Sequence, residues 1–342
     1  MRLPTIVAGL LVAGILSPAT GMLDGLAQAA TPSSGNGIGI RLLEAPVAAR
    51  ADMRAWTYII DHLAPGSVIH RRVEVFNTTN SPKHLSIYPA AAEIRNRKFQ
   101  FADGHTANEL SAWTTLNQHE VTLASHARST VTATITVPEE AAPGERYAMI
   151  WAETAKAAPA GGGVAEVNRV GIRLYLDVGR GNPPASDFTI DSLTAQRSPT
   201  GQQIVLAQVH NTGGRALDLS GDLKLTSSSG SQHYSAGPYK VRTGTTLAPG
   251  DVGSVTATLT EQVPDGPWRA RIRLESGLTK RTAEATIQFP ATGTAQAVKA
   301  EMDADFHPMM ALVIGIALTA LAASAFLLIQ RKRRSRREPS NA

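Results

Sequence analysis

The feature that most limits the possible folds is a pattern of alternating apolar and polar residues that occurs twice. Residues 123–151 and 247–272 share Leu-Ala, then Val-Thr-Ala-Thr, then a turn with Pro and Gly, then an aromatic residue that opens another alternation. Upstream, residues 73–78 and 207–212 both end an apolar run with Asn-Thr. Successive side chains of a strand point to opposite faces, so a period of two predicts half-buried strands. We therefore expect two tandem copies of one β unit.

Each copy contains several short strands separated by Pro and Gly turns, without a convincing amphipathic helix. Residues 130–137 place Val, Ala and Ile on one face and Thr on the other, and residues 170–178 and 204–209 also read as strands. This pattern predicts an all-β fold of two tandem immunoglobulin-like β-sandwiches, followed by a single transmembrane α-helix. The chain has no cysteine, which excludes an antibody-type disulfide core.

Changes in composition suggest where the domains begin and end. We predict a first sandwich over 38–180 and a second over 187–290, joined by the Gly- and Pro-rich segment between them. Residues 155–163 are expected to form a loop inside the first domain. Residues 291–307 are expected to be a juxtamembrane spacer.

The N-terminus, residues 1–30, has the pattern of a secretory signal peptide. Arg2 gives it a positive start, residues 5–16 are apolar but too short to span a bilayer, and Ala27-Gln28-Ala29 supplies small residues for cleavage. The alternative is an uncleaved N-terminal anchor. Either reading sends the body of the chain across the membrane.

Residues 308–330 are long and apolar enough to cross the bilayer, and the tail 331–342 that follows is basic. A cationic cluster stays in the cytoplasm and stops transfer. The predicted location is thus the plasma membrane, with one span, both domains outside and the tail inside. The predicted stop-transfer residues are Arg331, Lys332, Arg333, Arg334, Arg336 and Arg337.

The high isoelectric point of about 9.6 does not indicate a nucleic-acid partner. Of 33 Lys and Arg, seven lie in the signal and tail, and of 28 Asp and Glu, two do, which leaves 26 of each between them. The exported part is close to neutral, so it lacks the charge that a polyanion would require.

No pattern in the sequence indicates catalysis. His119-Glu120 begins like a zinc-protease helix, but position 123 is Leu instead of the second His, and the segment reads as a strand. There is no G-x-S-x-G elbow and no metal-ligand spacing among the nine His. We expect no enzyme activity and no cofactor.

Two weaker motifs leave alternatives open. Phe289–Gly293 resembles the sortase motif L-P-x-T-G, but its first residue is Phe, and charged residues separate it from the apolar segment, so a strand end is the other interpretation. Trp56, Tyr88 and Trp113 could stack on sugar rings or simply pack in the sandwich core.

Several segments of the first domain resemble a known family, namely residues 40–46, 58–66, 72–77, 142–147 and 170–175. Over residues 38–180 the chain looks similar to the WxL-interacting protein family of Gram-positive cell surfaces. That resemblance implies a peptidoglycan-binding first domain and a second domain that meets a surface or secreted protein, such as a WxL protein. We carry over no binding residue from it.

The function expected from the sequence is a non-enzymatic, membrane-anchored scaffold that binds the cell wall and a protein partner. The alternative is an extracytoplasmic assembly chaperone for secreted surface proteins. Tandem sandwiches can serve that role by pairing an edge strand with a partner.

Overall fold

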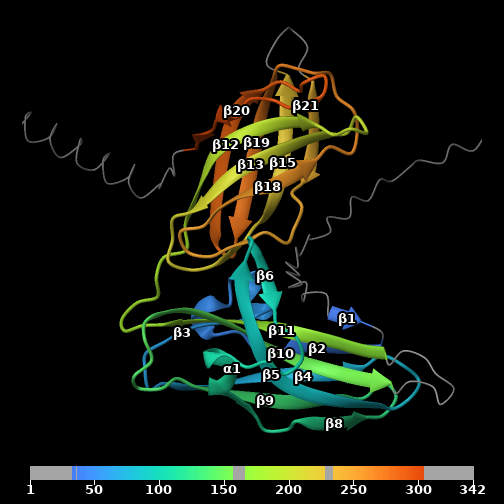
Figure 1. Cartoon of the computed structure of the whole chain (residues 1–342), viewed down its shortest axis with the longest axis vertical. Coiled ribbons are helices and arrows are strands. Elements are labelled where there is room, and N and C mark those ends of the chain that lie inside the picture. Colours follow the sequence, from blue (N-terminus) through green and yellow to red (C-terminus); the bar gives the residue numbers. More distant parts are fainter. Residues whose placement is uncertain (1–32, 36, 157–165, 228–233, 304–342) are drawn as a thin grey trace, which may run out of the picture.

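The computed structural model describes residues 33–35, 37–156, 166–227 and 234–303, which form two sandwiches (Figure 1). The predicted signal peptide, membrane span and basic tail with its stop-transfer arginines lie outside the described residues. So does most of the loop expected at 155–163. Among the residues that are described, no helix has the length and hydropathy needed to cross a membrane.

The first sandwich, blue to green in the lower half of Figure 1, packs two sheets. Their strand orders are β1-β2-β4-β9-β7 and β3-β11-β10-β5-β6, with β8 paired to β5. The elements are β1 (Ser33–Gly35), β2 (Ile38–Leu42), η1 (Val47–Ala49), η2 (Met53–Trp56), β3 (Ile59–Leu63), β4 (Val68–Asn77), β5 (Lys83–Arg95), β6 (Lys98–Phe101), α1 (Glu109–Trp113), β7 (Thr114–Leu116), β8 (Glu120–Leu123), β9 (Arg128–Thr136), β10 (Gly144–Lys156) and β11 (Glu166–Val178).

The second sandwich stands above the first in Figure 1 and also packs two sheets. Their orders are β18-β13-β12-β21, with β22 on β12, and β16-β15-β19-β20-β23, beside a small β14-β17 ladder. The strands are β12 (Phe188–Arg197), β13 (Gln203–Asn211), β14 (Leu217–Asp218), β15 (Ser220–Ser227), β16 (Ser235–Lys240), β17 (Thr246–Leu247), β18 (Val252–Thr258), β19 (Trp268–Ser276), β20 (Thr279–Ile287), β21 (Gly293–Thr294), β22 (Val298–Lys299) and β23 (Glu301–Met302).

Each sandwich buries its own apolar core between its sheets. In β9 the predicted alternation holds, because Val131, Ala133 and Ile135 are fully buried while the Thr residues between them are not. Burying one such aliphatic side chain stabilises the fold by roughly 1.5–3 kcal/mol. The prediction of an all-β, immunoglobulin-like architecture is confirmed for the described part of the chain, which has little helix.

The shared Asn-Thr and Leu-Ala motifs form the same contact in both sandwiches, here called the loop lock: the Asn side chain binds backbone carbonyls where two loops meet. The buried side chain of Asn77 donates to the carbonyls of Ser81 and Ala124, at 2.7 and 3.0 Å. That of Asn211 donates to the carbonyls of Leu247 and Ala248, at 3.1 and 3.0 Å. In each copy the amide therefore satisfies backbone acceptors where two loops meet, which explains why the motifs recur together.

The chain changes sheets between β2 and β3. β2 pairs with β4 in one sheet, whereas β3 pairs in parallel with Leu174–Val178 of β11 in the other. The segment that connects them, residues 43–58, holds η1 and η2 and lies beside the second sandwich. This switch leaves the first half of β11 beyond the reach of β3.

The spacer predicted over 291–307 differs from the structure. β21 and β22 pair with β12, and β23 pairs with β20, so residues 293–302 complete the second sandwich. The alternation of apolar and polar residues did not predict β21, β22 and β23, because each of these strands is only two residues long. Phe289 is buried in the core at 2% exposure, and this burial favours a strand end over a sorting motif.

Candidate functional site

The outer face of the β3-β11-β10-β5-β6 sheet carries a second apolar cluster that is separate from the core. Because neighbours along a strand point to opposite faces, Leu174 enters the core while Tyr175 points outward. The Tyr175 ring lies 5.6, 5.2 and 5.8 Å from the rings of Tyr58, Phe99 and Tyr147. These rings form an aromatic surface on the side of the sheet opposite the core.

One end of this outer face is built around Gly171. Any side chain on Gly171 would collide with Trp151, since a Cβ would come within 2.6 Å of its Cε3 atom. The Trp151 ring therefore lies across the glycine, with the ring of Phe101 edge-on at 5.0 Å. The guanidinium of Arg169 covers both rings, at 4.5 Å from Trp151 and 5.2 Å from Phe101. Phe101 is half exposed, so this end of the face is open to solvent.

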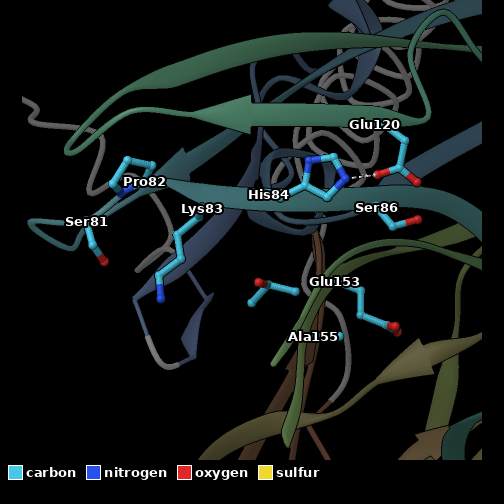
Figure 2. Close-up of a pocket in the computed structure, with 9 residues that line it drawn as sticks. Ser81, Pro82, Lys83, His84, Ser86, Glu120, Glu153 and Ala155 are labelled. Carbon is cyan, nitrogen blue, oxygen red and sulfur yellow. Dashed lines mark ion pairs between the residues drawn. The ribbon is translucent and has the colours of Figure 1, made fainter. Parts of the chain in front are cut away.

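Beyond it lies an open hollow of 490 Å³ (Figure 2). In Figure 2 the side chains of His84 and Glu120 face each other, and their ion-pair distance is 2.9 Å. The Tyr88 hydroxyl donates to Glu153 at 2.5 Å. No group of three or more residues within the described ranges could hold a metal ion. The lining residues are Ser81, Pro82, Lys83, His84, Ser86, Glu120, Glu153, Thr154 and Ala155.

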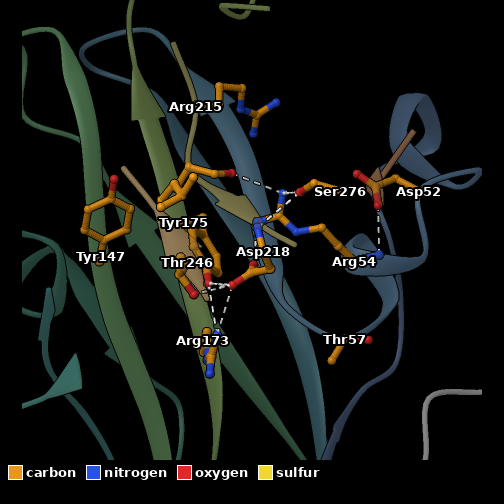
Figure 3. A network of polar contacts seen from close by, with 12 residues as sticks. Asp52, Arg54, Thr57, Tyr147, Arg173, Tyr175, Arg215, Asp218, Thr246 and Ser276 are labelled. Carbon is orange, nitrogen blue, oxygen red and sulfur yellow. Dashed lines mark hydrogen bonds and ion pairs between the residues drawn. The ribbon is translucent and has the colours of Figure 1, made fainter. Parts of the chain in front are cut away.

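The other end of the outer face is covered by the second sandwich, where Asp218 joins the two (Figure 3). The Asp218 carboxylate accepts from Arg54 at 2.8 Å and from Arg173 at 3.2 Å, both on the first sandwich. It also accepts from the hydroxyls of Tyr175 at 3.1 Å and Thr246 at 2.7 Å. One carboxylate thus binds side chains from both domains.

Arg54 reaches this site from η2. Its guanidinium also donates to the carbonyl of Ala216 at 3.2 Å and to the hydroxyl of Ser276 at 3.4 Å. Burial alone would lower the pKa of Arg54, but the charges around it, of which Asp218 contributes most, together outweigh burial, and the pKa is raised above its ordinary value. Asp52 holds the turn in place by accepting from the backbone N–H of Arg54 at 2.8 Å.

A buried carboxylate, Glu145, makes a second link between the domains. It accepts from the backbone N–H of Ala216 and from the hydroxyl of Tyr147, both at 2.7 Å. Burial raises the pKa of Glu145 and of Tyr147, because each would have to carry its charge away from water. The domains are therefore held together by buried polar contacts as well as by the linker.

The edge of β11 is the most distinctive backbone feature of this site. β10 pairs with the whole of β11 on one side, while β3 pairs on the other side only from Leu174 onward. In the part of the chain that the structure describes, no strand pairs with that second edge over Arg169–Arg173. Unpaired backbone groups at such an edge are ready to bind another strand.

The three aromatic residues named as candidates for sugar stacking, with core packing as the alternative, have different surroundings. Tyr88 is buried on the outer face, stacked at 3.6 Å on His105. Trp113 packs against the core, with Arg146 4.9 Å above its ring. Trp56 is 38% exposed in η2. The three belong to separate clusters, and their role in binding stays a prediction.

Sequence reasoning missed the residues that build this site. Arg54 and Asp218 belong to no motif, Glu145 was noted only as part of the segment 142–147, and the three act together only because the domains dock. A usable signal existed in β11, where Arg169, Gly171, Arg173 and Tyr175 occupy alternate positions and so share one face.

No protein-family model matches the chain, and no curated protein matches it. Solved structures with a similar fold include the YadV chaperone, at 12% identity and TM-score 0.38, covering 73% of this chain and 100% of that one. The E. coli chaperone DraB is 14% identical with TM-score 0.35, covering 72% and 95%. The Salmonella enterica SafA pilin in complex with the SafB chaperone is another, at 10% identity and TM-score 0.39, covering 67% and 93%.

These comparisons correct the family predicted from the sequence. The resemblance to WxL-interacting proteins was wrong, because no family model and no curated protein matches the chain. The quoted segments lie mostly in strands and turns, where alternation and turn chemistry recur in unrelated sandwiches.

Proposed function

We propose that this protein is a non-enzymatic, extracytoplasmic chaperone that holds secreted surface proteins by adding one of their strands to the open edge of β11. The observation that carries the proposal is the stretch Arg169–Arg173, which β10 pairs on one side only. A stretch of five residues is about the length of an ordinary strand. Backbone hydrogen bonds to such an edge give affinity without requiring one particular sequence.

The docking of the two domains supports this role. Asp218 and Glu145 fix the second sandwich against the outer face at one end of β11, while Trp151 and Phe101 lie at the other end. A partner at the edge would thus meet a preformed surface and would not have to order it. Preorganisation of this kind reduces the entropy cost of binding.

We place both sandwiches outside the cytoplasm, with the chain tethered to the plasma membrane. The support is the sequence itself, which has a secretory pattern at 1–30 and an apolar segment at 308–330 followed by a basic tail. A cell-wall scaffold, the first expectation from the sequence, finds no support in the comparisons, and we do not propose it.

Site-specific photo-crosslinking in cells tests the proposal. A photoreactive residue replaces Val167, which is 54% exposed on β11, and the matched control replaces Val68, which is 52% exposed on β4. We expect secreted proteins to crosslink at position 167 and not at position 68. The same proteins should be degraded when the gene is deleted, because their unpaired strands would then be exposed.

Three results would count against the proposal. Equal crosslinking at both positions would mean that β11 has no special role. Crosslinked proteins that stay intact in the deletion strain would mean binding without a chaperone function. Cosedimentation of the protein with isolated cell walls, without any crosslinked secreted protein, would favour a wall scaffold instead.

A further inference from the structure

The side chain of Arg169 is placed unusually for an arginine on a sheet face. Glu153 lies directly opposite it on β10, and cross-strand neighbours of opposite charge ordinarily pair. Within the described residues, however, Arg169 makes no ion pair, and its guanidinium covers the rings of Trp151 and Phe101. Arg173, two positions past Gly171 on the same face, pairs with Asp218. Among the described residues, Arg169 is thus an arginine of this face without a carboxylate partner.

Neighbouring contacts explain why Glu153 does not form an ion pair with Arg169. The carboxylate of Glu153 accepts from the hydroxyl of Tyr88, and both Glu153 and Arg169 act on that phenol. Burial and Glu153 raise the pKa of Tyr88, while Arg169 lowers it. The phenol therefore lies between the two charges, and the Arg169 guanidinium both interacts with this phenol and lies over the two aromatic rings.

Stacking prepares Arg169 to bind an anion. A guanidinium on an aromatic face keeps its five N–H donors in the plane of the group, where they remain available to a carboxylate. Because two rings fix its orientation, less side-chain entropy is lost when a partner binds. Arg169 lies within the open stretch of β11, which β3 does not reach before Leu174, so a strand added to that edge would place a side chain beside it.

We infer that Arg169 selects partner strands that carry an acidic side chain opposite Arg169 or Gly171, so that the open edge of β11 has a charge preference. This inference rests on the proposed strand addition and makes it more specific. An aspartate or glutamate there would form a charge-assisted hydrogen bond with the stacked guanidinium. A lysine at the same position would be repelled by Arg169.

Binding of two synthetic peptides to the full chain in detergent micelles tests this inference. The probes are fluorescein-labelled Thr-Val-Thr-Ile-Asp-Val-Thr-Ile-Thr and the same peptide with Lys for Asp, compared by fluorescence anisotropy. We expect the Asp peptide to bind about tenfold more tightly than the Lys peptide, a typical factor for one charge-assisted hydrogen bond. The preference should shrink as salt is added, because the site is open to solvent.

Variants of Arg169 separate charge from packing. Arg169→Met keeps an apolar contact with the rings and should bind both peptides equally. Arg169→Glu should reverse the preference in favour of the Lys peptide. Tryptophan fluorescence and circular dichroism of each variant check that the fold is intact, and the reversal by Arg169→Glu cannot come from unfolding.

The outcomes distinguish the two proposals. If the wild type binds both peptides equally, or if Arg169→Met keeps the preference, the role of Arg169 is refuted while strand addition stands. If neither peptide binds at any concentration below aggregation, strand addition at β11 is itself refuted, and the charge preference with it.

Discussion

Replacing Asp218 by asparagine removes the charge that joins the two sandwiches while keeping the shape of the side chain. Arg54 and Arg173 would then face a neutral amide, and Arg54 could not recover its hydration because it is buried. Breaking a fully buried ion pair costs about 3–5 kcal/mol. The side chains of Asp218 and Arg54 are 19% and 14% exposed, so we expect about 2–3 kcal/mol, slightly below that range.

Urea unfolding of the full chain in micelles, followed by tryptophan fluorescence, measures this loss. With a typical dependence of about 2 kcal/mol per molar urea, the midpoint should fall by about 1–1.5 M. Asp222→Asn is the matched control, because Asp222 is half-buried on β15 and makes no ion pair within the described residues. A change of under about 0.5 kcal/mol is expected there.

A double variant identifies the source of the effect. Arg54→Met should cost less in the Asp218→Asn background than in the wild type, because the guanidinium that it removes has already lost its charged partner. If Asp218→Asn shifts the midpoint no more than Asp222→Asn does, the network contributes nothing to holding the domains together. Equal costs of Arg54→Met in the two backgrounds would show that the pair is not coupled.

Three further changes are predicted to alter stability, each measured by the same urea midpoint. Burial raises the pKa of Glu145 in the folded protein. The contribution of Glu145 to the stability of the fold is therefore fully present below its ordinary pKa of 4.5 and is lost as the pH rises through the raised pKa. Between about pH 5 and about pH 8 the midpoint should therefore fall more in the wild type than in Glu145→Gln, and parallel curves would contradict this. Gly171→Val should cost about 1–3 kcal/mol, because its side chain collides with Trp151, and an unchanged midpoint would mean that the ring moves away freely. Asn77→Ala and Asn211→Ala should each cost about 2–3 kcal/mol by leaving buried carbonyls without donors, and a silent change at either site would show that the two loop locks are not equivalent.

Much of the fold could be predicted because alternation reports burial directly. The alternate apolar residues Val131, Ala133 and Ile135 of β9 and Val255 and Ala257 of β18 are the ones that line the two cores. The repeated Asn-Thr and Leu-Ala motifs correctly indicated a shared plan, although their joint role in the loop lock became visible only in three dimensions. Short strands escaped prediction, since a pair such as Val298–Lys299 contains no period.

The candidate site was harder to predict because it depends on contacts distant in sequence. Arg54 and Asp218 are 164 positions apart, and neither stands in a pattern that marks it. The family resemblance failed for a related reason, since strand and turn segments are shaped by the sandwich and not by one function. The open edge of β11 follows from where β3 starts, at Ile59 opposite Leu174, and no composition signal marks that register.

If residues 308–330 span a membrane, as the sequence predicts, the pairing of residues 293–302 with the second sandwich limits how far this protein can extend from that membrane. The backbone N–H of Asp303 donates to the carbonyl of Thr282, so the second sandwich extends at least to Asp303, and four residues of sequence separate it from the span predicted at 308–330. At about 3.5 Å per residue, a chain from Asp303 to the start of the predicted span at residue 308 covers at most about 17 Å. This would keep the second sandwich near the lipid headgroups. Newly exported chains would then meet the open edge of β11 mainly by lateral diffusion in two dimensions, close to where they leave the bilayer.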